Sequence, residues 1–85
     1  MPQQSRDEIA KKVCQTLADI IGVDSEQLHG HTELVRDLHL DSLSIFELVI
    51  ELEESYHLQI PDEDIDRIRT IDDIVDYILQ KLKEK

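Results

Sequence analysis

Apolar side chains recur at helical spacing near the start of the chain. The residues that share one side of such a helix are Ile9, Ala10, Val13, Cys14, Leu17, Ile20 and Ile21. Ser5 and Glu8 form an S-x-x-E capping box ahead of this run, and Gly22 follows it as a stop. The pattern predicts a first helix up to Gly22, with residues 1–4 frayed and Cys14 buried as a small hydrophobic side chain.

A second helical pattern runs from Asp41 to about Tyr56 and carries apolar residues on two sides. One arc holds Ile45, Leu48, Val49, Leu52 and Tyr56. The nearly opposite side holds an apolar strip of Leu43, Phe46 and Ile50, rimmed by Glu47, Glu51, Glu53 and Glu54. A small domain cannot easily bury both sides of one helix, so we expect the apolar strip to be a docking surface for another protein. The alternative is that the long loop before this helix folds over the strip.

That loop, residues 23–40, shows no sustained period. Its expected anchors into the core are Leu28, Leu34, Val35, Leu38 and Leu40. Short helical turns are expected near residues 25–28 and 32–35. The loop also carries His29 and His31, which we interpret as a solvated pair rather than metal ligands, since no further ligands lie nearby in the sequence.

The end of the chain predicts two more helices. Pro61 suits the start of a short helix from Asp62 to Ile68, and Thr70 with Asp73 caps a longer one. The inward side chains of this last helix are Ile71, Ile74, Val75, Ile78, Leu79 and Leu82. The predicted fold is all-α, a small bundle of three principal helices plus one short helix before the last. We expect a single domain over residues 1–85, with its core between about 5 and 82.

Charge narrows the range of partners. The chain has 20 acidic and 9 basic residues, a net charge of −11. Such a surface repels nucleic acids and anionic membranes and attracts basic patches on proteins. Nine acidic residues and no Lys or Arg fall between Asp41 and Asp66, so the acidity gathers around the second helix. We therefore expect protein partners, no nucleic acid, no membrane insertion and a monomer.

Little in the sequence indicates a metal site or a disulfide. The single cysteine excludes an internal disulfide and a cysteine-based zinc cluster. The Asp62-x-Asp64-x-Asp66 run resembles the start of a calcium loop, but Arg67 and Asp73 stand where that loop needs Gly and Glu. We predict no metal site and leave weak divalent binding to the acidic surface open. With no signal pattern and no long apolar run, a cytoplasmic protein is expected.

Ser42 is the candidate for chemistry. Asp41 is a helix N-cap signal, so Ser42 would be the first helical residue, at the positive end of the helix dipole, where a phosphate is favoured. The alternative is that Ser42 is a second capping residue. His39 is near in sequence, but the chain lacks the G-x-S-x-G context of a hydrolase. We therefore expect no enzyme activity, and a Ser42 that is modified rather than catalytic.

The stretch from Asp37 to Leu43, D-L-H-L-D-S-L, is similar to the D-L-G-x-D-S-L phosphopantetheine attachment motif of acyl carrier proteins. Further matches at the family's spacing are Glu47-Leu48-Val49, Leu52-Glu53-Glu54, Ile60-Pro61-Asp62-Glu63-Asp64 and Val75-Asp76-Tyr77-Ile78. This resemblance implies 4′-phosphopantetheine esterified to Ser42 by a separate Mg-dependent transferase, with the thiol of the arm carrying acyl groups as thioesters. The chain's own thiol, Cys14, is expected to be buried, so the arm would supply the reactive sulfur.

The resemblance also assigns residues to two surfaces. Partner contacts, beside the attachment residues Asp41 and Ser42, would be Leu43, Phe46, Glu47, Ile50, Glu53, Glu54 and Asp62. An acyl pocket would be lined by Leu34, Val35, Ile45, Leu48, Leu52, Ile60, Ile65, Ile68 and Ile74.

The sequence departs from the family pattern in three ways. His39 stands where Gly is usual, which questions any positive φ there. Ser44 replaces a frequent acidic residue. Ile65 and Ile74 are bulky where many relatives have Ala, and we hypothesise that they shrink or reshape the pocket.

We therefore expect an acyl carrier protein that serves the transferase and fatty-acid synthesis enzymes with basic docking patches. One alternative is a carrier of a polyketide, aminoacyl or other specialised pathway. Asp41 ahead of Ser42 favours an acyl load, because peptidyl carriers commonly have Gly-His or Gly-Asp there. An alternative of another class is an acidic adaptor without a prosthetic group.

Overall fold

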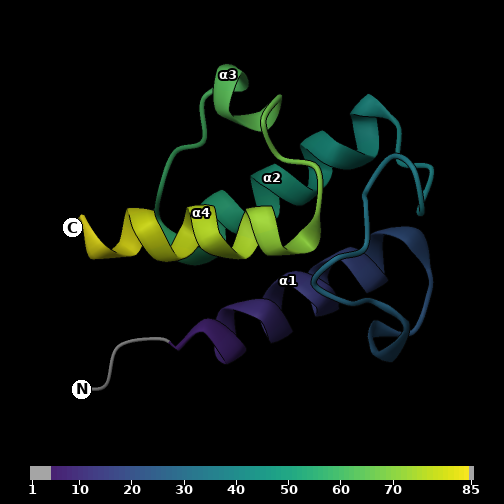
Figure 1. Cartoon of the computed structure of the whole chain (residues 1–85). Coiled ribbons are helices and arrows are strands. Elements are labelled where there is room, and N and C mark those ends of the chain that lie inside the picture. Colours follow the sequence, from purple (N-terminus) through teal and green to yellow (C-terminus); the bar gives the residue numbers. More distant parts are fainter. Residues whose placement is uncertain (1–4, 85) are drawn as a thin grey trace.

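The computed structural model describes residues 5–84, which fold into a bundle of helices (Figure 1). The elements are α1 (Arg6–Ile21), the 3-10 helix η1 (Ser25–Gln27), α2 (Ser42–Tyr56), α3 (Asp62–Ile65) and α4 (Ile71–Lys83). The predicted all-α fold, with three principal helices and a short one before the last, is confirmed. The expectation that residues 1–4 fray lies outside the described residues. None of the described helices is both long and apolar enough to cross a membrane.

Both ends of α1 are set by the residues that the sequence indicated. The Ser5 hydroxyl accepts from the Glu8 N–H at 3.2 Å, and the Glu8 carboxylate accepts from the Ser5 N–H at 3.2 Å. At the other end Gly22 takes a left-handed conformation, with φ of 75°, and its N–H donates to the Ala18 carbonyl. Glycine adopts this conformation without the steric cost that a β-carbon brings.

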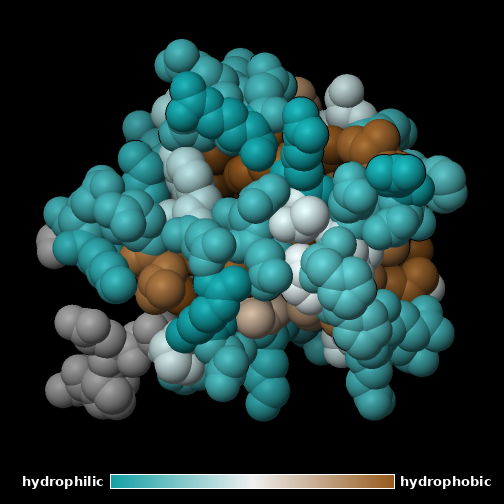
Figure 2. Space-filling view, viewed as in Figure 1, coloured by the Kyte–Doolittle hydropathy of each residue, from teal (hydrophilic) through white to brown (hydrophobic). Residues whose placement is uncertain are grey.

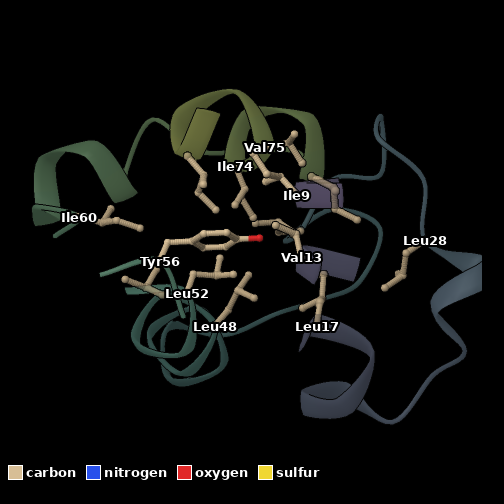
Figure 3. Close-up of a cluster of buried hydrophobic side chains, with 14 of the residues drawn as sticks. Ile9, Val13, Leu17, Leu28, Leu48, Leu52, Tyr56, Ile60, Ile74 and Val75 are labelled. Atoms are coloured by element: carbon tan, nitrogen blue, oxygen red, sulfur yellow. The ribbon is translucent and has the colours of Figure 1, made fainter. Parts of the chain in front are cut away.

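The core lies between the three long helices. In Figure 1, α1 and α4 run in opposite directions, and α1 packs against both α4 and α2. Figure 3 shows side chains from all three helices meeting around the ring of Tyr56. The largest fully buried side chains are Ile9, Val13, Leu17, Leu34, Leu48, Leu52, Ile71, Val75 and Ile78. The expected inward faces of the long helices are thus confirmed, and the core is almost wholly aliphatic.

The long loop is fixed to the core and to the start of α4. Leu28, Leu34 and Leu40 are buried and Leu38 is half-buried, as expected. The loop backbone also pairs with the segment before α4: the Leu34 N–H donates to the Arg69 carbonyl at 2.9 Å, next to an isolated bridge between residues 33 and 70. The loop therefore closes the end of the bundle at which α1 ends and α2 begins.

Val35 was expected to anchor this loop, and that expectation is wrong. The side chain of Val35 is 60% exposed. Leu34 is held inward by the pairing with Arg69, and the backbone turns directly afterwards, with the Asp37 and Leu38 N–H groups both donating to the Glu33 carbonyl. Two neighbours on this tight turn cannot both point into the core, so Val35 faces outward.

Helix α3 is shorter than expected. The sequence pattern runs to Ile68, but the helix ends at Ile65 and continues as two tighter turns, Arg67 N–H to Asp64 carbonyl and Ile68 N–H to Ile65 carbonyl, both at 3.1 Å. Such i-to-i+3 bonds are typical of a tightening end of a helix. A tertiary contact secures this short element, because the Tyr77 hydroxyl on α4 donates to the Asp64 carboxylate at 2.5 Å.

Cys14 is half-buried rather than fully buried, so its predicted burial is only partly correct. Its sulfur lies 4.0 Å from the Leu28 carbonyl oxygen, and burial raises the pKa of the Cys14 thiol. A raised pKa leaves less of the nucleophilic thiolate at neutral pH. Cys14 therefore behaves as a packing residue at the edge of the core.

Candidate functional site

The start of α2 is built by Asp41. Its backbone is extended, and its carboxylate accepts from the Ser44 N–H at 2.9 Å, which satisfies a donor that the helix itself cannot pair. This hydrogen bond lowers the pKa of the Asp41 carboxyl, because it favours the charged form. Ser42 is consequently the first residue of α2 and its side chain is exposed, as predicted.

The chain reaches this cap through an unusual backbone conformation at His39. Its φ is 55°, in the left-handed region, and its N–H donates to the Val35 carbonyl at 3.0 Å. The next residue, Leu40, is buried, and its N–H donates to the Leu34 carbonyl at 3.1 Å. The positive φ that a glycine would favour is thus present, and histidine adopts it.

An open depression of about 460 Å³ lies beside Ser42, between α2 and α3. Ser42 itself is part of the lining. The other lining residues are Val35, Ile45, Phe46, Asp62, Ile65, Asp66 and Ile68. The walls are therefore mainly aliphatic and aromatic, with two carboxylates among them.

A second hollow lies behind the first, inside the core. It holds only about 10 Å³ of free space and is lined by Leu34, Ile45, Leu48, Val49, Leu52, Ile60, Ile65, Ile68 and Ile74. Eight of these nine residues belong to the acyl pocket implied by the family resemblance. Val35, the ninth implied residue, lines the outer depression instead, and Val49 lines the inner hollow. Ile45, Ile65 and Ile68 border both spaces.

The apolar strip of Leu43, Phe46 and Ile50 is exposed, and its Phe46 also lines the outer depression. Leu43 is 67% exposed, Phe46 47% and Ile50 50%. The long loop packs at the end of the bundle instead of over this strip, so the alternative that the loop buries it is wrong. Figure 2 shows apolar surface at the upper right, over the N-terminal part of α2, bordered by hydrophilic atoms.

The acidic residues around the strip differ in their surroundings. Glu47 and Glu54 are exposed, whereas Glu53 is half-buried and its carboxylate accepts from the Ile60 N–H at 2.8 Å. Asp62 lies across the outer depression from Ser42, at the start of α3. The structure therefore places Asp62 on the same depression as Ser42, and it gives Glu53 a hydrogen bond that holds the segment after α2.

Several site residues were not indicated by the sequence. The contact between Tyr77 and Asp64 joins residues 13 positions apart on different helices, and burial, followed by the Asp64 hydrogen bond, raises the pKa of the Tyr77 hydroxyl. Asp66 lines the outer depression, but nothing in the sequence apart from its charge indicated this position. For Val49, which lines the inner hollow, the only indication in the sequence was its place on the apolar arc of α2.

The histidines and the aspartate run form no ligand cluster. His29 and His31 are exposed, and their rings stack with centroids 5.7 Å apart. Asp62 and Asp64 lie in the single turn of α3 instead of in a calcium-type loop. Within residues 5–84 no three His, Cys, Asp or Glu side chains are grouped so that they could hold a metal ion.

The comparisons with known proteins agree with this geometry. The family model described as the phosphopantetheine attachment site matches residues 11–78, which include the whole of α2 and both hollows. The chain belongs to the acyl carrier protein family. Since that matched domain is the phosphopantetheine attachment domain of acyl carrier proteins, the prosthetic group of this chain is 4′-phosphopantetheine.

Individual acyl carrier proteins are similar over most of the chain. The acyl carrier protein of Rubrobacter xylanophilus is 39% identical over 75 residues, which are 88% of this chain and 93% of the relative. That of Syntrophobacter fumaroxidans is 45% identical over 67 residues, 79% of this chain and 83% of the relative. A solved acyl carrier protein from Enterococcus faecalis superposes with a TM-score of 0.77 at 32% identity, covering 91% of this chain and 98% of that structure.

Proposed function

We propose that Ser42 is the residue that carries the phosphopantetheine arm, and that the chain transports acyl groups as thioesters on it for fatty-acid synthesis. The observation that supports this proposal most directly is the position of Ser42. It combines the serine of the attachment motif, an exposed hydroxyl at the start of a capped helix, and an adjoining apolar depression. In this view the chain is a single, monomeric carrier domain of the cytoplasm with no catalysis of its own.

The surroundings of Ser42 fit this group. The hydroxyl would form a phosphoester to the arm while coenzyme A loses its adenosine bisphosphate and the hydroxyl proton leaves to a base of the transferase. The bound arm supplies a thiol, which the described part of this chain offers only as half-buried Cys14. The positive end of the α2 dipole favours the phosphate, and Asp41, which accepts from the Ser44 N–H, keeps the first turn formed. The open side of the depression leaves room for the arm.

The partners would be the transferase and the acyl-chain enzymes, which bind through basic patches. Glu47 and Glu54 are exposed beside the apolar strip of Leu43, Phe46 and Ile50. Charges of this kind speed the encounter with a basic surface, and the apolar strip then supplies area to bury. Asp62 at the start of α3 extends the same acidic rim toward Ser42.

Attachment is tested by intact mass. The chain is incubated with coenzyme A, Mg²⁺ and a broad-specificity phosphopantetheinyl transferase. We expect a gain of one phosphopantetheinyl group and, with acyl coenzyme A, of one acylated arm. The gain should disappear in Ser42→Ala.

Ser55→Ala is the matched control, because Ser55 is an exposed serine in the last turn of the same helix. It should be modified like the original chain. Absence of any mass gain in the original chain, or a full gain in Ser42→Ala, would rule out the proposed attachment site.

A further inference from the structure

Arg36 is an isolated cation beside the proposed attachment site. It is the only lysine or arginine between Lys12 and Arg67, so it stands alone in the long acidic middle of the sequence. Its neighbour Val35 lines the same outer depression as Ser42. Arg36 therefore lies at the border of the surface on which partners would meet the arm.

The side chain of Arg36 makes only one weak ion pair within residues 5–84. It is 80% exposed, and its guanidinium lies 3.8 Å from the carboxylate of Glu33. Exposed pairs of this kind contribute little to stability, because salt screens them and both side chains lose freedom. A carboxylate on another protein can therefore replace Glu33 at little cost.

The backbone that presents Arg36 is held by hydrogen bonds on both sides of it. The Asp37 N–H donates to the Glu33 carbonyl at 3.0 Å, and the Glu33 N–H donates to the Asp37 carboxylate at 2.9 Å. The pairing of Leu34 with Arg69 fixes the same turn to the segment before α4. Since this turn is already ordered, a partner that binds Arg36 has to order little besides the arginine side chain.

The sign of the surface charge changes at Arg36. The exposed Glu47 and Glu54 lie further along α2, and the first turn of α2 has no acidic residue. A partner with a uniformly basic surface would bring a cation against Arg36, and such a like-charge contact weakens binding. A partner with a carboxylate at that point would instead form an ion pair, for which the planar guanidinium offers two parallel hydrogen bonds.

We propose that Arg36 is a specificity contact for the enzyme that elongates the carried acyl chain, and that this enzyme presents a carboxylate to Arg36 next to the basic patch that binds α2. The proposal rests on the proposed attachment at Ser42. Val35 is 60% exposed and supplies apolar area beside the ion pair. The arrangement selects a partner of mixed charge and disfavours one that is basic throughout.

The test measures how tightly the full chain, loaded with the arm, binds the chain-elongating enzyme of the same organism. Titration calorimetry at low salt compares the original chain with Arg36→Gln and Arg36→Glu. We expect a several-fold loss of affinity in Arg36→Gln and a larger loss in Arg36→Glu, and both losses should shrink as salt rises. General attraction to a basic partner predicts the opposite, because Arg36→Glu makes the chain still more acidic.

Lys12→Glu is the matched control, because it makes the same charge change at an exposed position of α1, outside both hollows. It should bind the elongating enzyme at least as tightly as the original chain. A broad-specificity transferase should load both Arg36 variants as fast as Lys12→Glu, which shows that the surroundings of Ser42 are intact. If Arg36→Glu distorts the turn, Arg36→Gln carries the test, since it adds no negative charge there.

A charge exchange identifies the opposing carboxylate. The surface carboxylates beside the basic patch of the elongating enzyme are replaced by lysine one at a time. One of these replacements should restore the binding of Arg36→Glu and weaken the binding of the original chain. If none restores it, the proposed ion pair is wrong.

The outcomes separate the two proposals. A chain that gains no arm in the mass spectrum refutes the attachment at Ser42 and this contact with it. A chain that is loaded, but whose Arg36 variants bind the elongating enzyme as tightly as the original chain or more tightly, refutes the contact alone. Slower loading of both Arg36 variants by the transferase also refutes it, since Arg36 would then act on the surroundings of Ser42 and not on one partner.

Discussion

His39 takes a left-handed conformation at the position where the attachment motif usually has glycine. With φ of 55°, it directs the chain from the turn at Val35 into Leu40 and Asp41, and so sets the start of α2. Histidine tolerates this region better than most side chains but still carries a β-carbon that crowds the backbone. The loop thus has, at His39, the left-handed backbone conformation that glycine favours, and the β-carbon of histidine makes this conformation strained.

His39→Gly should relieve that strain. We expect the free energy of unfolding to rise by up to about 1 kcal/mol, because a left-handed residue with a β-carbon costs roughly that much. Urea denaturation monitored by circular dichroism measures the change. His39→Ala is the control, since it removes the imidazole but keeps the β-carbon. An equal gain in the alanine variant would show that the side chain, and not the backbone, is the cause.

The cap at Asp41 predicts a pH-dependent contribution to stability. Because the Ser44 N–H lowers the pKa of Asp41 in the folded state, the stabilisation is present above the ordinary aspartate pKa and is lost as pH falls through the folded value. Asp41→Ala should lower the urea midpoint at pH 7, and the difference from the original chain should shrink toward pH 3. Asp41→Asn keeps a good cap and should stay near the original chain at neutral pH. A pH-independent loss in Asp41→Ala would contradict this account.

For the helices, the spacing of apolar residues was sufficient to predict where α2 lies and which of its sides are apolar. It could not predict contacts between residues that are far apart in the sequence. The two apolar sides of α2 follow directly from spacing, and the exposed strip of Leu43, Phe46 and Ile50 was read correctly. For α3, the spacing of Ile65 and Ile68 suggested a helix that extends to Ile68. Both residues do pack against the core, but the helix ends at Ile65. Spacing alone could not show that the backbone tightens after one helical turn.

The hydrogen bond between Tyr77 and Asp64 is the contact that we expect to hold α3 against α4. Tyr77→Phe removes only the hydroxyl and should lower the free energy of unfolding by about 1 kcal/mol. Hydrogen exchange of the amides in residues 62–68 should accelerate more than exchange in α1. Uniform acceleration across the molecule would contradict a local role.

The hydrogen bond between Tyr77 and Asp64 should also make the stability of the protein depend on pH in the alkaline range. Burial and the bond to Asp64 raise the pKa of the Tyr77 hydroxyl in the folded state. Its contribution is therefore fully present below the ordinary tyrosine pKa of about 10 and is lost as pH rises above that value. The stability difference between the original chain and Tyr77→Phe, measured in urea, should narrow as pH rises above 10. A constant difference up to pH 11 and beyond would argue against ionisation of Tyr77 as the cause.

For the molecule as a whole, the sequence predicted the helices, the aliphatic core and the position of Ser42, since caps and periodicity report on local structure. It did not predict which loop residues turn outward. Val35 and Leu34 are neighbours of similar character, and only the pairing of Leu34 with Arg69 decides that Val35 faces the depression. The division of that region into an outer and an inner hollow likewise depends on how three isoleucines from different segments meet.

The net charge of −11, with its concentration around α2, predicts how partners approach. Glu47 is exposed beside the apolar strip. Within residues 5–84 it makes no hydrogen bond like the one that ties Glu53 to Ile60, so Glu47→Lys should leave the free energy of unfolding nearly unchanged. We expect it to lower kcat/KM of the transferase for the unmodified chain several-fold at low salt, through slower association, and the difference to shrink as salt screens the charges. Glu26→Lys makes the same charge change on the distant η1 and serves as control. Equal losses in both variants would mean that net charge, and not the acidic rim of α2, guides the encounter.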